Sequence, residues 1–160
     1  SGIPYGTAFV KNSYVGRTFI KPKQSSRESS VRVKLNVLRE AVEGKRVIMI
    51  DDSIVRGTTS DRIVHMLREA GAKEVHMRVS SPPFLWPCYF GTDVPAREQL
   101  IAYNRTVEEI RQVIGADSLG YLDCSRLRQM AGDLPICTGC FTGNYPLDPP
   151  MEDIRGEFEQ

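Results

Sequence analysis

Two adjacent carboxylates, Asp51 and Asp52, follow a hydrophobic run and precede a loop of small and hydroxylated residues; residues 47–60 read VIMIDDSIVRGTTS. Neighbouring carboxylates repel each other, so they need hydrogen-bond donors or a cation, and the vicinal hydroxyls of a ribose are such donors. The loop residues that would contact a ligand are Ser53, Arg56, Gly57, Thr58, Thr59 and Ser60. Backbone N–H and hydroxyl groups that open a helix favour phosphate, and a glycine lets the backbone approach it closely. The combination predicts a ribose-phosphate site, although either half alone is more typical of a capped turn.

Three elements must position this site. Residues 46–50 form a short β-branched run without alternation, which predicts a strand covered on both faces. Residues 58–70 carry apolar side chains at helical spacing and stop at Gly71, and residues 74–80 return as a strand. Strand, helix and strand predict a βαβ unit with parallel strands, in which ligands bind beyond the carboxyl ends. The predicted fold class is therefore α/β, with a parallel sheet flanked by helices.

The remaining chain is predicted more coarsely. A strand over 3–10 precedes a basic, mobile loop over 11–34, and residues 31–43 predict a short helix followed by an extended piece. Further predictions are helices over 95–103 and 105–114, a short strand over 118–122, a helix over 124–131 and irregular structure from 134 onwards. Residues 1–134 are interpreted as one domain and residues 135–160 as a cysteine-containing C-terminal segment.

Charge and hydropathy exclude several classes of function. With 21 basic and 20 acidic residues the net charge is +1, which gives the whole chain no general attraction to nucleic acid or membranes. No apolar run approaches the roughly 20 residues that span a bilayer, and no signal-peptide pattern opens the chain. These features predict a cytoplasmic protein. The basic residues concentrate between Lys11 and Lys34, as in a solvated loop or in a loop that meets a polyanionic ligand.

Cys137 and Cys140 form a C-x-x-C pair, a spacing that lets two sulfurs share a metal. Cys88 follows Pro87, far away in the sequence, and Cys124 lies between them. In a cytoplasmic protein four cysteines indicate free thiols or metal ligands before disulfides. A structural zinc, an iron–sulfur cluster and buried free thiols all remain open on spacing alone.

Five blocks of the chain resemble one family of type I phosphoribosyltransferases. These blocks are residues 11–22 (KNSYVGRTFIKP), 30–36 (SVRVKLN), 47–60, 80–95 (SSPPFLWPCYFGTDVP) and 137–146 (CTGCFTGNYP). They resemble the glutamine phosphoribosyl-diphosphate (PRPP) amidotransferases, and the resemblance covers about residues 3–146. It implies the type I phosphoribosyltransferase fold, incomplete in this chain.

The resemblance also implies roles for the site residues. Asp51 and Asp52 would hold the ribose hydroxyls with Mg²⁺ nearby, and the loop from Ser53 to Ser60 would hold the 5′-phosphate. The family's counterpart of residues 11–36 is a flexible loop that closes over PRPP, which would exclude water and stabilise leaving-group charge. Within residues 11–36 of this chain, the candidates for contacts to the diphosphate and the reacting centre are Lys11, Tyr14 and Arg17. Further candidates are Arg27, Arg32 and Lys34. Ser13 departs from the family pattern, which usually has a basic residue there.

For the cysteines, the resemblance implies that Cys88, Cys137 and Cys140 are ligands of a structural 4Fe–4S cluster. The fourth ligand is expected upstream of Ser1. Cys124 matches no ligand position of the family, so a buried thiol is its expected role, and it remains a substitute ligand if this chain assembles a site alone.

The implied activity is transfer of glutamine-derived ammonia to PRPP, which yields phosphoribosylamine in the first step of purine synthesis. The chain opens with Ser1 and lacks the N-terminal cysteine of the glutaminase half. We therefore expect the C-terminal part of a homo-oligomeric enzyme, which binds PRPP and purine nucleotides and needs its N-terminal glutaminase portion. Alternatives are a non-catalytic nucleotide-sensing module and a metal-bound module that docks a glutaminase chain. A base-salvage phosphoribosyltransferase is disfavoured by the cysteine blocks.

Overall fold

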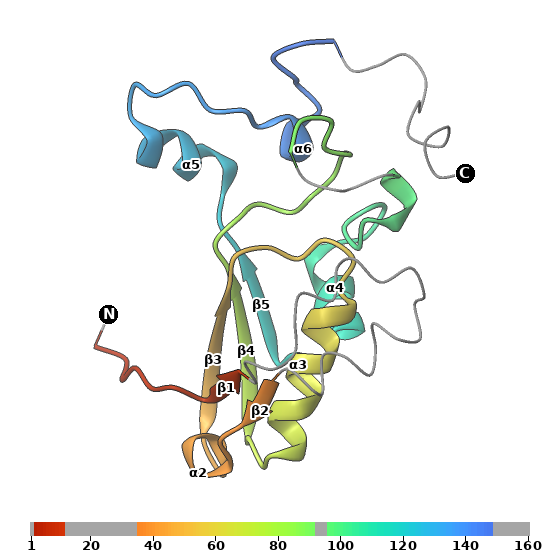
Figure 1. Cartoon of the computed structure of the whole chain (residues 1–160). Helices are drawn as coiled ribbons and strands as arrows, with labels where there is room; N and C mark the ends of the chain where they lie inside the picture. Colours follow the sequence, from red (N-terminus) through yellow and green to blue (C-terminus); the bar gives the residue numbers. More distant parts are fainter. Residues whose placement is uncertain (1, 12–34, 92–95, 149–160) are drawn as a thin grey trace.

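The computed structural model describes residues 2–11, 35–91 and 96–148, and its centre is a parallel sheet. The strands of this sheet, in spatial order, are β3 (Arg46–Asp51), β4 (Glu74–Val79) and β5 (Ser118–Tyr121). Helices α3 (Thr58–Glu69) and α4 (Val107–Val113) pack against it (Figure 1). The predicted α/β class and the predicted βαβ unit are confirmed.

The register of β3 and β4 explains where the site lies. Arg46 pairs with Glu74 at one end and Asp51 with Val79 at the other, so both strands end at the same level. The residues after each strand therefore face the same edge of the sheet, which Figure 1 shows below α5 and α6. The loop that follows β3 crosses this edge and enters α3.

The core lies between the sheet and the two helices. Its fully buried side chains include Val64 and Leu67 of α3, Met77 of β4 and Ile110 of α4. These residues come from a helix with a 3.6-residue period and a strand with a period of two, and each presents its apolar face to the other. Burial of these faces fixes α3, and with it the end of the loop that carries the site.

The opposite face of the sheet differs from expectation. Along β3, Val47 and Met49 pack on the core, whereas Ile48 is 42% exposed and Ile50 is 76% exposed. The prediction of a strand covered on both faces is therefore wrong for the part of the chain that the structure describes. The reason is that α3 and α4 both pack on the face that carries Val47 and Met49.

The N-terminal part also differs from expectation. Among the described residues 2–11, only Phe9–Lys11 forms a strand, β1. It pairs antiparallel with β2 (Leu35–Val37), which α2 (Arg39–Val42) follows. Residues 3–8 were predicted as strand but form none, because the pairing with β2 begins only at Phe9. For residues 35–43 the predicted order of helix and extended piece is reversed. Residues 12–34, which include most of the predicted mobile loop, lie outside the described residues.

The segment after β4 holds the third correction. Residues 95–103 were predicted as a helix, but within the described part of this segment only Arg97–Gln99 forms a short 3₁₀ helix, η2. Its neighbours instead bond to distant segments, as the N–H of Ile101 does to the carbonyl of Val55, at 2.8 Å. Helix α4 is confirmed, and a capping box between Thr106 and Glu109 starts it.

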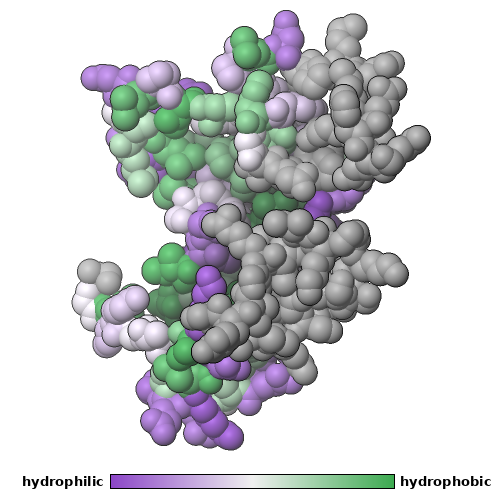
Figure 2. Space-filling view, in the orientation of Figure 1, coloured by the Kyte–Doolittle hydropathy of each residue, from purple (hydrophilic) through white to green (hydrophobic). Residues whose placement is uncertain are grey.

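The C-terminal part forms a second, smaller cluster. Helix α5 (Cys124–Ala131) matches its prediction, and α6 (Gly139–Thr142) is a short helix within the segment predicted to be irregular. Phe84 and Leu100 form the buried centre of this cluster, against which Phe141 packs. Apolar side chains on α5 and after it are exposed, notably Met130 and Leu134, and Figure 2 shows hydrophobic surface in this upper region. No helix among the described residues is long and apolar enough to cross a membrane.

Candidate functional site

The two acidic residues lie at the carboxyl end of β3, where the sequence predicted them. The carbonyl of Asp51 accepts hydrogen bonds from the N–H of Ser80, at 2.9 Å, and from the Ser80 hydroxyl, at 3.1 Å. These bonds fasten the end of β3 to the residue that follows β4. Asp51 is half-buried and Asp52 is exposed, so the pair opens to solvent at the edge of the sheet.

The two carboxylates accept few hydrogen bonds from the protein. The Asp51 carboxylate accepts the N–H of Asp52, at 3.0 Å, and the Ser53 hydroxyl donates to Asp52 Oδ1, at 3.2 Å. Burial raises the pKa of Asp51 above its ordinary value, the N–H of Asp52 opposes that rise, and the Asp52 charge adds to it. Ligand hydroxyls or a cation would therefore stabilise the charged form of the pair.

The loop ends in a helix N-terminus that is open to an anion. Gly57 is the N-cap of α3, with φ of 81°, and no side chain caps the helix there. The first helical bond runs from the N–H of Asp61 to the Gly57 carbonyl, so the N–H groups before it have no partner within the helix. Thr58 and Thr59 are exposed beside them, whereas Ser60 is buried, at 3% exposure. A phosphate at this end would meet backbone donors, two hydroxyls and the positive end of the helix dipole.

A segment distant in sequence contacts the loop. Ile101 packs on Gly57 so closely that a Cβ at position 57 would lie 2.2 Å from Ile101 Cδ1. Arg56 Nη2 donates to Gln99 Oε1, at 2.8 Å. Sequence reasoning missed both supporting residues. Gly57 was a signal that the sequence offered, because a glycine in a loop can mark a positive φ or the close approach of another residue to its α-carbon. It did not show that this residue is Ile101.

Two of the four cysteines lie beside this segment. The carbonyl of Cys140 accepts the N–H groups of Leu85 and Trp86, at 2.9 and 3.0 Å, and Cys88 and Cys140 both pack on the cluster of Phe84 and Leu100. Burial raises the pKa of Cys140 to about 11, and Cys88, Cys137 and Cys124 add to the rise. None of the four cysteines forms a disulfide, and Cys137 is exposed.

Comparisons with known proteins find relatives of high sequence identity. The chain is 56% identical to the amidophosphoribosyltransferase of Archaeoglobus fulgidus, over 97% of this chain and 35% of that protein. It is 55% identical to the enzyme of the same name from Bacillus subtilis, over 92% of this chain and 32% of that protein. No protein-family model matches the chain.

Solved structures give the same result. The glutamine PRPP amidotransferase of B. subtilis, in complex with ADP and GMP, superposes with a TM-score of 0.79 and 54% identity, over 94% of this chain and 34% of the other. A second structure, described as the allosteric regulatory enzyme of purine biosynthesis, has a TM-score of 0.80 and 53% identity, over 96% of this chain and 34% of the other. In sequence and fold, the chain belongs with the amidophosphoribosyltransferases. It spans about a third of the length of these relatives.

The family resemblance drawn from the sequence blocks is thereby confirmed, whereas the predicted roles of single residues stay predictions. Asp51, Asp52 and the loop to Thr59 form one continuous stretch of chain between β3 and α3. Lys11 is exposed at the end of β1, and that strand lies well below the loop in Figure 1. Tyr14 and Arg17 lie outside the described residues, as do Arg27, Arg32 and Lys34.

Two hollows among the described residues lie away from the acidic pair. One hollow of about 330 Å³ is lined by Arg97, Tyr103 and Asn104 among others, and one of about 340 Å³ lies between β2 and α3. Neither includes Asp51 or Asp52.

The domain boundary predicted between residues 134 and 135 stays a prediction as well.

The sequence predicts two inorganic groups, Mg²⁺ and an iron–sulfur cluster. The side chains present have the right chemistry for both, but they are not positioned as a complete metal site. Mg²⁺ is typically held by one or two carboxylates together with substrate phosphates, a role for which Asp51 and Asp52 are suited. Cys88, Cys137 and Cys140 provide the soft thiolates of an iron–sulfur cluster. Within the described ranges, however, no group of three histidine, cysteine or acidic residues is placed to hold a metal ion.

Proposed function

We propose that this chain provides the PRPP-binding part of an amidophosphoribosyltransferase. The observation that carries the proposal is the continuity of the site: the acidic pair ends β3, and the same loop opens α3 at Gly57 without a capping side chain. One ligand with a vicinal diol and a phosphate matches both ends of this loop. The whole reaction would transfer ammonia from glutamine to PRPP, release pyrophosphate and form 5-phosphoribosylamine in the first step of purine synthesis.

In this proposal each residue has a defined task. Asp51 and Asp52 accept hydrogen bonds from the ribose hydroxyls and orient the sugar. The hydroxyls of Ser53, Thr58 and Thr59 and the first N–H groups of α3 hold the 5′-phosphate, with Arg56 and Gly57 in the same loop and Ser60 behind it. Lys11, Tyr14 and Arg17 contact the diphosphate and the reacting centre, where cationic groups stabilise the charge that develops on the leaving group.

Two inorganic groups belong to the proposal. Mg²⁺, held by the substrate diphosphate with Asp51 and Asp52 near it, would neutralise charge on the leaving group. A 4Fe–4S cluster with Cys88, Cys137 and Cys140 as ligands, and a further ligand from outside this chain, would cross-link the C-terminal part of the chain. This cross-link would stabilise the packing around Phe84 and Leu100. The remaining elements of the proposal are a glutaminase portion, a homo-oligomer and a cytoplasmic location.

A binding titration tests the proposal. NMR spectra of the chain should shift at the Asp51–Thr59 loop when ribose 5-phosphate or PRPP is added with Mg²⁺. The double variant Asp51→Asn with Asp52→Asn should weaken this binding about tenfold or more, because hydrogen bonds to charged groups are lost. Absence of binding, or shifts that spare this loop, would refute the proposed site.

A second measurement separates an enzyme from a nucleotide sensor. The related structure from B. subtilis is a complex with ADP and GMP, which makes nucleotide binding by this chain a question of its own. Purine monophosphates and PRPP should be titrated separately while pyrophosphate release is assayed with ammonia. Binding of nucleotides without any pyrophosphate release, even when a glutaminase portion is supplied, would favour the regulatory module.

A further inference from the structure

Gln99 accepts a hydrogen bond from Arg56, the one arginine of the loop proposed to bind phosphate. Arg56 Nη2 donates to Gln99 Oε1, at 2.8 Å, across 43 residues of sequence. Arg56 is exposed. A guanidinium has five N–H donors, so this bond occupies one of them and leaves the others for an anion.

The turn that carries Gln99 is fastened to the loop at two more points. The N–H of Ile101 donates to the carbonyl of Val55, at 2.8 Å, and its side chain packs on Gly57. Positions 55, 56 and 57 are therefore each in contact with residues 99–101. Gln99 is exposed, but it lies on a turn that contacts the loop at these three positions.

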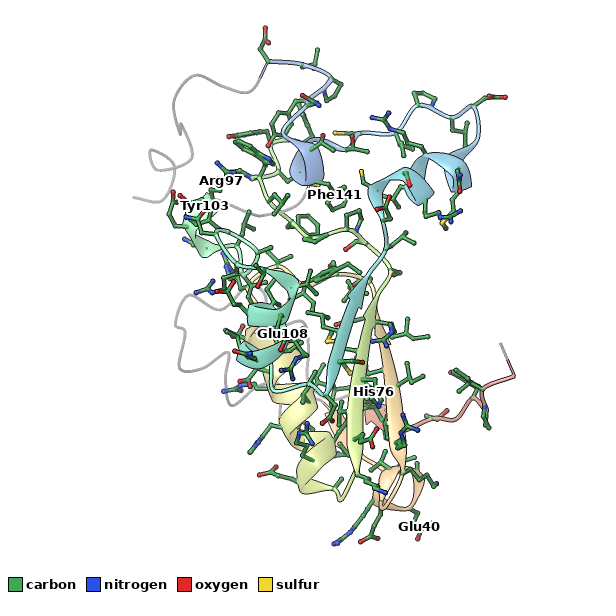
Figure 3. All side chains as sticks on the ribbon, turned by 180° about the vertical axis from the view of Figure 1, so that it is seen from behind. Glu40, His76, Arg97, Tyr103, Glu108 and Phe141 are labelled. Atoms are coloured by element: carbon green, nitrogen blue, oxygen red, sulfur yellow. The ribbon has the colours of Figure 1, made fainter. Side chains whose placement is uncertain are left out.

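The other side of the same turn is anchored as well. Arg97 Nε donates to the carbonyl of Leu85, at 2.9 Å, and its guanidinium carbon lies 3.5 Å from the centre of the Trp86 ring. It also lies 5.2 Å from the centre of the Tyr103 ring, and Figure 3 shows Arg97 and Tyr103 together near Phe141. Cation–π contacts of this kind restrict the arginine and thereby the backbone that leads to Gln99.

We propose that Gln99 is a positioning residue: its amide oxygen orients the Arg56 guanidinium toward the phosphate bound at the start of α3. This inference rests on the proposed function, since it assigns a support to the same site. An arginine side chain loses considerable rotamer freedom when it binds an anion. Because Gln99 already restricts Arg56 in the ligand-free chain, less side-chain entropy is lost when the ligand binds.

The pair can be examined without any ligand. In side-chain NMR spectra the guanidinium signal of Arg56 is identified by its disappearance in Arg56→Lys. Gln99→Leu, which keeps the size but removes the acceptor, should shift this signal to that of a free arginine. Gln99→Glu keeps an acceptor oxygen and should preserve a restrained signal. An identical Arg56 signal in the wild type and in Gln99→Leu overturns the inference.

The consequence for binding is measured by titration with ribose 5-phosphate. Gln99→Leu should weaken binding about fivefold, the usual effect of one hydrogen bond, while Gln99→Glu stays within about twofold of the wild type. In an Arg56→Ala background, Gln99→Leu should have no further effect, because the residue acts through Arg56. An equal loss with and without Arg56 would mean a merely structural role and overturns the inference.

A matched control is present in α5. Gln129 Oε1 accepts from Arg126 Nη1 at the same 2.8 Å, away from the proposed site. Gln129→Leu should leave the titration unchanged. If the wild-type chain binds no ribose 5-phosphate, the proposed function fails and this inference with it; if binding occurs but Gln99→Leu does not affect it, only the inference fails.

Discussion

The side chain of Ile101 lies against the bare α-carbon of Gly57, at the point where the loop after β3 turns into α3. Gly57 satisfies two conditions at once: its φ of 81° is unfavourable for other residues, and the space where a Cβ would lie is filled by Ile101. The loop geometry thus depends on a residue 44 positions later in the sequence.

Gly57→Ala is expected to destabilise the chain by about 1–3 kcal/mol, because the left-handed backbone conformation is strained and the new methyl group meets Ile101. Urea unfolding measures this change. Gly44→Ala is the matched control, since Gly44 has φ of 69° but no atom within 4 Å of its Cβ position. Its loss should be clearly smaller. Equal losses would show that Ile101 yields without cost.

Asp51→Asn should separate stability from ligand binding. Burial raises the pKa of Asp51 above 3.8, so the folded chain binds this proton more tightly than the unfolded chain does. The stability contributed by the group is thus fully present below 3.8 and is lost as the pH rises through the folded-state pKa. At neutral pH the variant should unfold at higher urea concentration than the wild type, although ribose 5-phosphate binds about tenfold more weakly.

The stability difference between Asp51→Asn and the wild type should shrink as the pH falls toward 4. Asp133→Asn serves as the comparison, because Asp133 is an exposed carboxylate away from the loop. A difference that grows on acidification would contradict the direction of the pKa shift.

Trp86 offers a selective probe of the C-terminal cluster, since it is the single tryptophan of the chain. A Cβ at Gly143 would lie 2.9 Å from the Trp86 ring, and Gly143 has φ of 79°. Gly143→Ala should therefore displace the indole, shift its fluorescence to longer wavelength and cost about 1–3 kcal/mol. Gly132→Ala, with φ of 59° and open space around it, should leave the emission maximum in place.

The cysteine assignment is tested by anaerobic reconstitution with iron and sulfide. Replacement of Cys88, Cys137 or Cys140 by serine should remove most of the bound iron, because serine is a poor ligand for this soft site. Cys124→Ser should retain it. Iron and sulfide contents per chain are the readout, and equal loss in Cys124→Ser would make Cys124 a ligand.

Local signals were sufficient for part of the fold. The β-branched run of β3 and the helical spacing of α3 are properties of neighbouring residues, and the structure has these elements close to their predicted bounds. Residues 95–103, in contrast, were predicted as a helix. Leu100 is buried in the C-terminal cluster and the Ile101 N–H bonds to Val55, so tertiary partners and not a helical period decide that segment.

By itself, the sequence determined the βαβ unit, the acidic pair at the end of β3 and the family to which the chain belongs, because these depend on short-range pattern and on contiguous motifs. Only the tertiary structure decided that Gln99 meets Arg56, that Ile101 meets Gly57 and that Cys88 and Cys140 pack on the same cluster as Leu100. Such contacts join residues whose separation along the chain carries no period. Their partners are chosen by how the sheet and the C-terminal cluster pack, and that choice is made only when the whole chain folds.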